Sequence, residues 1–227
     1  MPSRISVIIP AFNEEQSIGL VLNALPQDQL HEIIVVDNNS TDNTVRFASE
    51  KGARVVAEKR RGYGSACLKG ISVLNNPDIV VFLDGDFSDY PEEIIHLVKP
   101  IESGEMDFVL GSRMILPESR LALLPQSRYG NQLAVFLIRL FFRHKYTDLG
   151  PFRAIRYDSL KSIAMQDTNF GWTVEMQIKA VKKRLRIREI PVKYRDRIGV
   201  SKITGTFSGT IKAGTKIIYT IFKYLLT

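Results

Sequence analysis

Short apolar runs alternate with amphipathic stretches along the first 110 residues. The runs suit strands buried on both faces, and the stretches between them repeat apolar residues at helical spacing. We expect strands over residues 4–9, 32–37, 53–58, 78–84 and 107–113, and helices over 16–25, 44–52, 66–76 and 91–104. The alternation predicts an α/β fold whose mostly parallel central sheet is flanked by helices on both faces.

The rhythm changes after residue 113. We expect a very apolar helix over 128–142, a strand running into a helix over 150–163, an amphipathic helix over 172–185, a strand over 186–195 and a basic amphipathic tail helix over 210–226. The longest apolar stretch, 133–142, contains Arg139 and is far shorter than the roughly 18 to 20 residues that span a bilayer. The first apolar run, about five residues, is too short for a signal peptide. We therefore expect no membrane-spanning or secretory segment.

Composition is that of a globular protein, with 227 residues, 44% hydrophobic and 24% charged. This length suits one α/β domain of ordinary size, or two small ones. The single cysteine, Cys67, excludes a disulfide framework and a cysteine zinc cluster, and fits a reducing compartment.

Charge is distributed unevenly along the chain. The net charge is +7, yet the segment from residue 179 onward holds 13 Lys or Arg and two acids, and the preceding part is slightly acidic. A basic C-terminal quarter suggests an anionic partner: nucleic acid, lipid headgroups or phosphates. The alternative is a basic face that only contacts water.

Polar and glycine-rich segments follow the expected strands, at 10–15, 37–42, 58–64, 84–86 and 111–113. In open parallel sheets, ligands bind outside the carboxyl ends of the strands. These five segments would lie along that one edge, which is where we expect the functional site.

The segment Asp84-Gly85-Asp86 directly follows the most apolar strand. Two carboxylates two residues apart on an extended chain point the same way, and they repel unless a cation joins them. Mg²⁺ or Mn²⁺ takes one or two carboxylates plus substrate phosphate oxygens. We therefore expect half of a metal site here, the alternative being a solvated turn. We interpret the neighbouring Asp89 as a helix cap.

Three other segments carry candidate chemistry. Asp37 could accept hydrogen bonds from a base or ribose, with helix capping by residues 40–42 as the alternative. Gly62 lies among three basic residues, 59–61, where backbone N–H groups could meet phosphate. The pattern is neither a P-loop nor a dinucleotide-binding fingerprint. The basic loop 195–202 could close over a diphosphate, or could simply be exposed to water.

Taken in order, these motifs resemble the family 2 glycosyltransferases with the GT-A fold, and within them the dolichyl-phosphate mannose and glucose synthase branch. The resemblance spans nearly the whole chain and rests on segments 7–15, 35–44, 61–66, 82–94, 111–113, 150–156, 171–180 and 196–202. It implies one GT-A domain over residues 1–227. Residues 1–113 would bind the nucleotide sugar, and 114–227 would bind the acceptor and carry the basic tail.

The resemblance also implies roles for individual residues. Asp86, Arg113, Arg197 and Lys202 would be catalytic. Pro10, Ala11, Asn13, Glu14, Asp37, Gly62, Asp84 and Ser201 would bind the nucleotide sugar, Asp84 and Asp86 the metal, and Arg113 and Arg153 the acceptor phosphate. Arg197, Ser201 and Lys202 would belong to the loop that closes on the donor diphosphate. Ser88 departs from the family pattern, since the mannose synthases often have a metal-binding glutamine there, so the role of Ser88 stays open.

The resemblance implies inverting transfer of a hexose from a GDP or UDP sugar to a polyprenyl phosphate, with Mg²⁺ or Mn²⁺. A phosphate monoester arrives largely ionised, so no strong base is needed. If the acceptor is instead a hydroxyl of a glycan or small molecule, Asp148 and Glu175 are the candidate bases. A non-catalytic RNA-binding module is a third hypothesis, which leaves the acidic cluster unexplained.

A polyprenyl phosphate sits in a bilayer, so we expect a cytoplasmic enzyme that is peripheral on the cytoplasmic face of the membrane. The segments 133–142 and 211–226 offer apolar faces with basic flanks, suited to docking at a membrane interface. The alternative is that both are core helices or contact a second copy or a membrane protein. We expect no nucleic-acid partner.

Overall fold

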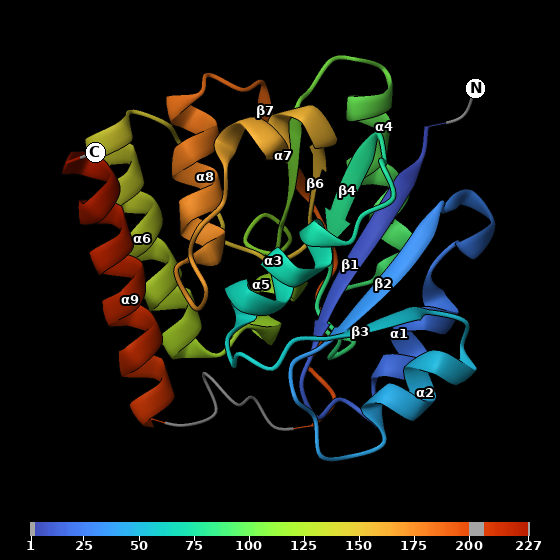
Figure 1. Ribbon diagram of the computed structural model, residues 1–227. Coiled ribbons are helices and arrows are strands. Elements are labelled where there is room, and N and C mark those ends of the chain that lie inside the picture. Colours follow the sequence, from blue (N-terminus) through green and yellow to red (C-terminus); the bar gives the residue numbers. More distant parts are fainter. Residues whose placement is uncertain (1–2, 200–206, 227) are drawn as a thin grey trace.

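The computed structural model describes residues 3–199 and 207–226 (Figure 1). Its strands form a seven-stranded sheet. They are β1 (Ile5–Ala11), β2 (Glu32–Asp37), β3 (Arg54–Ala57), β4 (Ile79–Phe82), β5 (Phe108–Ser112), β6 (Arg153–Arg156) and β7 (Ile187–Pro191). All five strands expected in the first half are present, which confirms the α/β class.

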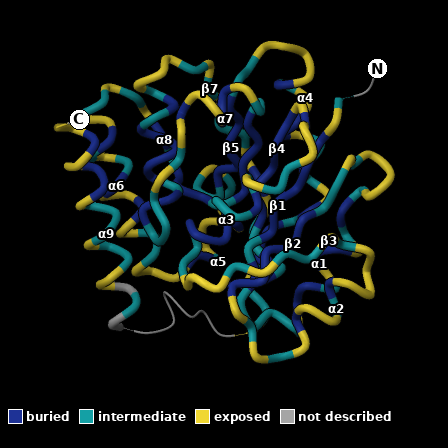
Figure 2. Tube along the Cα trace, in the orientation of Figure 1, coloured by how far each residue is buried: buried dark blue, intermediate teal, exposed yellow. Residues whose placement is uncertain are grey.

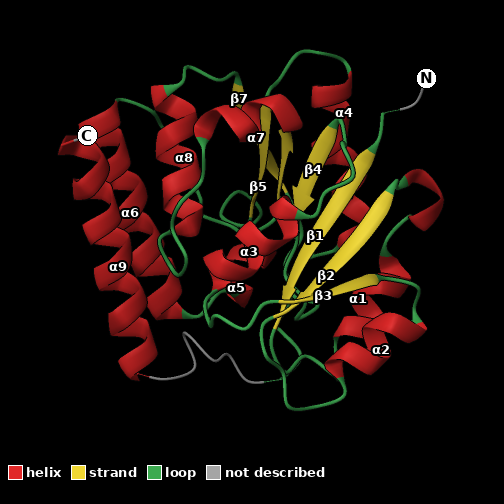
Figure 3. Ribbon diagram, viewed as in Figure 1, coloured by secondary structure: helices red, strands yellow, loops and turns green. Residues whose placement is uncertain are grey.

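Helices cover both faces of the sheet (Figure 3). The α-helices are α1 (Ile18–Ala24), α2 (Thr44–Glu50), α3 (Tyr63–Ser72), α4 (Ile94–Glu102), α5 (Pro117–Ala122), α6 (Pro125–Phe142), α7 (Tyr157–Ile163), α8 (Trp172–Lys182) and α9 (Phe207–Leu226). Short 3-10 turns lie at Gln27–Gln29 and Pro91–Glu93. One face packs against α1, α2 and α4, and the other against α3 and α6–α9.

The strand order is β3-β2-β1-β4-β6-β5-β7. β6 runs antiparallel to both β4 and β5, while the remaining neighbours are parallel. The order reverses direction between β1 and β4, because β2 and β3 extend to one side and β4 continues to the other. Such a switch point opens a crevice outside the carboxyl ends of the two strands. The expected metal-binding residues follow β4 and therefore lie at this crevice.

Alternating residues of β1 show why the central strands are apolar along their whole length. Ile8 belongs to the core shared with α3, α6, α8 and α9, whereas Val7 and Ile9 belong to the core shared with α1 and α4. All three side chains are fully buried. A central strand covered on both faces has no solvent side, so it reads as a continuous apolar run rather than an alternating one.

The two most apolar helices of the second half lie side by side at the left of Figure 1. Phe141 of α6 contacts Phe222 of α9, with ring centroids 5.4 Å apart. Part of each helix is core, as one of the two sequence interpretations held, because Ala134 and Ile138 of α6 and Ile221 of α9 are buried. Among the described residues, no helix is both long and apolar enough to span a bilayer.

Candidate active site

A cavity of about 330 Å³ opens at the crevice between β1 and β4. It is bounded by the end of β1, by the segment after β4 and by the start of α3. Its lining residues are Pro10, Ala11, Phe12, Glu14, Asn38, Arg61, Gly62, Tyr63, Ala66, Asp84, Gly85, Asp86, Asn169, Phe170 and Arg197. Seven residues assigned from the sequence are among them: Pro10, Ala11, Glu14, Gly62, Asp84, Asp86 and Arg197.

Asp84 lies at the inner wall of this cavity. The hydroxyl of Tyr63 donates a hydrogen bond to its Oδ1 at 3.0 Å. Burial raises the pKa of Asp84 to about 7, and the negative charge of Asp86 adds to the shift, while Tyr63 and Arg197 oppose it. A carboxyl poised in this way gains much from a cation placed between it and Asp86.

Asp86 is oriented by its own turn. Its Oδ1 accepts hydrogen bonds from the backbone N–H of Ser88 at 3.0 Å and from the Ser88 hydroxyl at 2.5 Å. Oδ2 faces the guanidinium of Arg197, at 3.2 Å from Nη1. In this conformation Ser88 therefore positions Asp86 rather than facing the cavity, which gives a role to a residue that the sequence left open.

Arg197 bridges the two sides of the cavity. Its Nη2 lies 2.9 Å from Oε1 of Glu14, in the loop after β1, while its Nη1 contacts Asp86. The backbone N–H of Ile198 donates to the Asp86 carbonyl. Arg195 stacks on the ring of Phe87, 3.7 Å from its centroid, and donates to the Phe87 carbonyl. The basic segment is thus attached to the turn after β4, which carries Asp86 and Phe87, by several contacts.

The carboxylates of Asp84 and Asp86 fit a hard divalent cation such as Mg²⁺ or Mn²⁺. A guanidinium already lies against Asp86 and Glu14, which shows that the site attracts positive charge. Within residues 3–199 and 207–226, no group of three or more His, Cys, Asp or Glu could hold a metal. The remaining ligands would come from the substrate diphosphate and water, as the sequence predicted.

The opposite side of the cavity has features suited to a nucleoside. The guanidinium of Arg61 stacks on Phe12, 3.5 Å from the ring centroid. Asn38 donates to the carbonyls of Glu58 and Arg60. Asn38 lines the cavity, whereas the preceding Asp37 does not appear in its wall and accepts the backbone N–H of Ser40 through Oδ1.

Asn13 is one of the sequence candidates that lie outside the cavity wall. It has a positive φ of 53°, its backbone N–H donates a hydrogen bond to the Ser40 hydroxyl oxygen, and its Oδ1 accepts one from the Thr41 N–H. These bonds join the loop after β1 to the loop after β2. Asn13 therefore shapes the nucleotide side of the site from outside the cavity.

The glycines before α3 serve a close backbone approach. The N–H of Gly62 donates to Oδ1 of Asn38. The φ of Gly62 is +143°, which residues other than glycine rarely adopt. A Cβ at Gly62 or Gly64 would collide with the carbonyl of Thr168 or Asp167 respectively. Because the Gly62 N–H is already bonded to Asn38, the expected contact between phosphate and backbone N–H groups of residues 59–64 would fall to the neighbours of Gly62.

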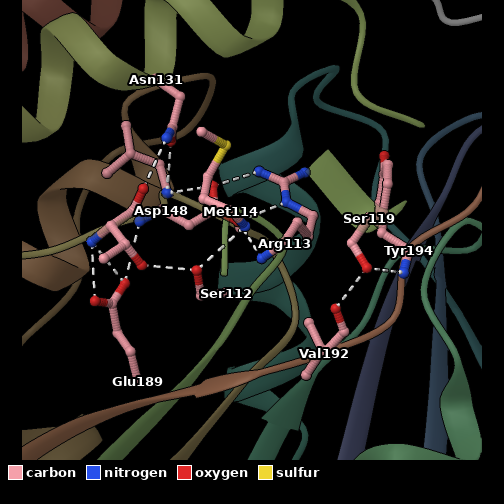
Figure 4. Close-up of polar contacts among 12 residues, drawn as sticks. Ser112, Arg113, Met114, Ser119, Asn131, Asp148, Glu189, Val192 and Tyr194 are labelled. Carbon is pink, nitrogen blue, oxygen red and sulfur yellow. Dashed lines mark hydrogen bonds and ion pairs between the residues drawn. The ribbon is translucent and has the colours of Figure 1, made fainter. Parts of the chain in front are cut away.

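Arg113 and Asp148 form a buried ion pair beside the site (Figure 4). Nε and Nη2 of Arg113 contact the two carboxylate oxygens of Asp148 at 2.7 and 2.8 Å. Although burial raises the pKa of Asp148, the charge and hydrogen bonds of Arg113 lower it below its ordinary value. Asp148 is therefore a weak base, and the Arg113 guanidinium is already occupied by this carboxylate.

Arg153 has no exposed surface. Its guanidinium donates to the backbone carbonyls of Leu149, Gly150 and Thr173. The expectation that Arg153 faces an acceptor phosphate does not match this conformation. The dipoles of these carbonyls balance the charge of Arg153 in the interior. The side chain thereby joins β6 to the start of α8.

Glu175 is also buried and fully bonded. Its oxygens accept from the backbone of Gln166 and Asp167 and from the Tyr224 hydroxyl at 2.6 Å, and Lys179 lies 2.7 Å away. These contacts hold the loop that covers Gly62 and Gly64. Glu175 thus links α9 to the cavity wall and does not line the cavity.

Asp89 corrects a second sequence interpretation. The short helical turn after it begins without any side-chain cap bond. The carboxyl of Asp89 is 2% exposed, and neither of its oxygens has a hydrogen-bond partner. Burial raises its pKa well above the ordinary value, assisted by the charge of Asp84. Asp89 is therefore not a helix cap but a buried acid without a side-chain hydrogen-bond partner.

The two remaining candidates, Ser201 and Lys202, lie outside the described residues. Sequence reasoning missed Asn38, Tyr63, Asn169 and Phe170, all of which line the cavity. Asn38 and Tyr63 adjoin motifs that were recognised, so their position was a usable signal. Asn169 and Phe170 follow no strand, and only the folding of their loop over α3 brings them to the site.

The family model described as Glycosyl transferase family 2 matches residues 6–164. The crevice lies at a sheet switch point, where open α/β sheets bind their ligands, and Asp84, Asp86 and Arg197 line it. The chain belongs to glycosyl transferase family 2 and is a glycosyltransferase.

Several curated relatives align over most of the chain. An uncharacterised glycosyltransferase of Mycobacterium tuberculosis is 34% identical over 92% of this chain and 94% of its own length. An undecaprenyl-phosphate mannosyltransferase of Micrococcus luteus is 30% identical over 91% and 90%. A dolichyl-phosphate hexose transferase of Haloferax volcanii is 30% identical over 94% and 92%.

Among solved structures, glucosyl-3-phosphoglycerate synthase from Mycobacterium tuberculosis, in complex with Mn²⁺, UDP and glucosyl-3-phosphoglycerate, is similar with a TM-score of 0.80. The match covers 98% of this chain and 80% of that one, at 23% identity. The likeness confirms the GT-A fold that the motifs implied.

Proposed function

We propose that this glycosyltransferase moves a hexose from a GDP or UDP sugar to the phosphate of a polyprenyl phosphate, with inversion at the sugar carbon. The donor would occupy the cavity, with its diphosphate near Asp84 and Asp86. A divalent cation bound by these carboxylates would neutralise the diphosphate charge as the leaving group departs. Two curated relatives are named for transfer to polyprenyl phosphates, which supports this acceptor class.

The observation that carries the proposal is the state of the carboxylates around the site. Asp148 is paired with Arg113 through both oxygens, and Glu175 is fully bonded and buried. Neither is free to deprotonate a sugar hydroxyl. A phosphate acceptor needs no such base, because its second pKa is near 6 and it is largely ionised at neutral pH.

In this mechanism an acceptor phosphate oxygen attacks the anomeric carbon, and the bond from that carbon to the diphosphate oxygen breaks. The chain has to position two anions and stabilise the leaving diphosphate. Arg197 lines the cavity and would contact the diphosphate. Arg113, bonded to both carboxylate oxygens of Asp148, would contact the acceptor phosphate.

The two halves of the chain would not divide cleanly between donor and acceptor. The cavity draws most of its wall from residues 10–86, yet Asn169, Phe170 and Arg197 also line it. We therefore propose a donor site that needs the second half of the chain for completion. The acceptor, being a lipid, would put the enzyme at the cytoplasmic surface of a membrane.

The test is an incubation of the protein with Mn²⁺, radiolabelled GDP and UDP sugars, and a polyprenyl phosphate, followed by organic extraction. Label in the organic phase supports the proposal. Label that instead appears on a soluble phosphorylated acid or a glycan, without lipid, would favour a hydroxyl acceptor. An uncharged polyprenol serves as the matched control, because it has the same chain without the ionised phosphate.

A further inference from the structure

One face of α6 carries large apolar side chains that no other part of the described chain buries. Tyr129, Leu133, Phe136 and Leu140 are 73, 48, 58 and 58% exposed. Their spacing of four, three and four residues places them on one stripe of the helix. The opposite face of α6, with Ala134 and Ile138, is buried in the core. α6 is therefore apolar on both faces, which an ordinary surface helix is not.

The helix beside it repeats this arrangement. In α9, Ile211, Tyr219, Phe222 and Leu226 are 53, 59, 43 and 86% exposed. The buried residues of α9, such as Ile221, lie on its other side. α6 and α9 pack against one another, and exposed positions recur along both (Figure 2). The two stripes together face away from the core.

The same surface continues to the active edge through α5. Leu121 and Leu124, at the end of α5 and the start of α6, are 72% and 45% exposed. α5 begins four residues after Arg113, and its Ser119 bonds to the backbone of Val192 and Tyr194 (Figure 4). We call the large exposed apolar residues of α5, α6 and α9, together with Leu124 just before α6, the α6/α9 surface: Leu121, Leu124, Tyr129, Leu133, Phe136, Leu140, Ile211, Tyr219, Phe222, Leu225 and Leu226.

The segments that carry this surface are rich in cations and nearly free of acids. Residues 115–145 and 207–226 contain one acid, Glu118. The basic residues in the same segments are Arg120, Arg128, Arg139, Arg143, Lys145, Lys212, Lys216 and Lys223. Lys216 is paired with Asp167, outside these segments.

We propose that the α6/α9 surface docks on an anionic lipid bilayer, with its apolar residues in the headgroup and acyl boundary and its cations against the lipid phosphates. Charge argues against a second copy as the occupant. A two-fold interface places the same patch on both partners, so it would bring two cationic surfaces together with one acid on each. An anionic bilayer supplies the missing charge.

A bilayer is the partner that a lipid acceptor requires, so the benefit of docking rests on the proposed function. The docking itself does not. The docking residues lie outside the donor cavity. The surface would hold the active edge beside the bilayer, where a lipid phosphate is accessible. Docking can therefore fail or succeed independently of sugar transfer.

The test is co-sedimentation with vesicles of phosphatidylcholine containing phosphatidylglycerol, compared with phosphatidylcholine alone. We expect binding to the anionic vesicles that weakens with salt, and a loss of at least about tenfold in Phe136→Glu/Leu140→Glu. Leu20→Glu/Val45→Glu is the matched control, because it puts the same charges on exposed apolar positions of α1 and α2. This control should bind as the parent does.

A second variant, Arg139→Gln/Lys212→Gln, keeps the apolar stripes and removes two cations, so it should bind anionic vesicles less while retaining its melting temperature. Equal vesicle binding by the parent and by Phe136→Glu/Leu140→Glu, or no vesicle binding by the parent, would overturn the inference. A parent dimer that Phe136→Glu/Leu140→Glu dissociates, measured by analytical ultracentrifugation, would overturn it as well. Phe136→Glu/Leu140→Glu should still transfer sugar to a short, water-soluble prenyl phosphate. Absence of that transfer in the parent would instead count against the proposed function.

Discussion

The guanidinium of Arg197 lies 3.2 Å from Oδ2 of Asp86 and 2.9 Å from Oε1 of Glu14. A positive charge thus occupies the mouth of the site in which Asp84 and Asp86 would hold a metal. Arg197 and a divalent cation would both neutralise Asp86, so they should compete in the nucleotide-free protein. When a diphosphate is bound, it can accept Arg197 in place of Asp86, and the competition should disappear.

Arg197→Ala should therefore bind Mn²⁺ more tightly than the parent in the absence of nucleotide. We expect a gain of about three- to tenfold, because the pair is partly exposed and its charges are partly screened. The free Mn²⁺ signal in electron paramagnetic resonance measures this directly. Arg46→Ala, which removes an exposed arginine of α2, is the control. Equal or weaker Mn²⁺ binding by Arg197→Ala would contradict the competition.

The same variant should lose turnover more than nucleotide affinity. Arg197 would contact the diphosphate most strongly as charge develops on the leaving group, and a contact of that kind affects kcat. We expect kcat to fall by at least about a hundredfold, with a change in nucleotide Kd below about tenfold. Steady-state kinetics and calorimetric titration of the nucleotide separate the two. An unchanged kcat would remove Arg197 from the mechanism.

Asp148→Asn should destabilise the protein, because it leaves the buried charge of Arg113 without its partner. Breaking such a pair costs about 3–5 kcal/mol in the free energy of unfolding. The lowered pKa of Asp148 means that the folded state holds fewer protons on it than the unfolded state does. The stability that Asp148 contributes is present above the ordinary pKa near 4 and is lost as pH falls below it.

Urea denaturation of the parent and Asp148→Asn, measured between about pH 3 and 7, tests both points. The difference in unfolding free energy should be largest near neutral pH and should shrink as the pH falls below about 4. A fully stable Asp148→Asn with no transferase activity would be the opposite result, and it would return Asp148 to the role of a catalytic base.

Gly64→Ala should disturb the loop that closes the cavity. A Cβ there would meet the backbone of Asp167 and Asn169, and backbone atoms cannot move aside as the end of a side chain can. We expect a loss of about 1–3 kcal/mol in stability and weaker nucleotide binding. Gly130→Ala on α6 is the control, since a Cβ there meets nothing within 4 Å. Thermal melting and nucleotide titration report the two effects, and a Gly64→Ala protein as stable as this control would contradict the packing.

Much of the donor site could be predicted because it depends on where strands end. Pro10 lies at the carboxyl end of β1, Glu14 follows β1, and Asp84 and Asp86 follow β4. Any parallel sheet with these two strands adjacent brings these residues together. Arg197 is distant in sequence, yet it follows an expected strand and carries the charge that the acids need.

The roles of other charged residues could not be predicted from their type. Arg153 and Glu175 look like site residues in the sequence, but their partners are mostly backbone groups and a distant tyrosine, Tyr224. Backbone partners leave no mark in a sequence. The place of β6 between β4 and β5 was equally hidden, because it is set by pairing between segments more than 40 residues apart.

Asp86→Ala, compared with the parent for sugar transfer to a polyprenyl phosphate, tests the central claim most directly. With Mn²⁺ and the labelled donor that the parent uses, the parent should move label into the organic phase, and Asp86→Ala should move none above background. The variant should keep the parent's circular dichroism spectrum, because Asp86 lies at the cavity wall rather than in the apolar core. Full transfer by a folded Asp86→Ala protein, or transfer by the parent that persists after all divalent metal is chelated, would contradict the assignment.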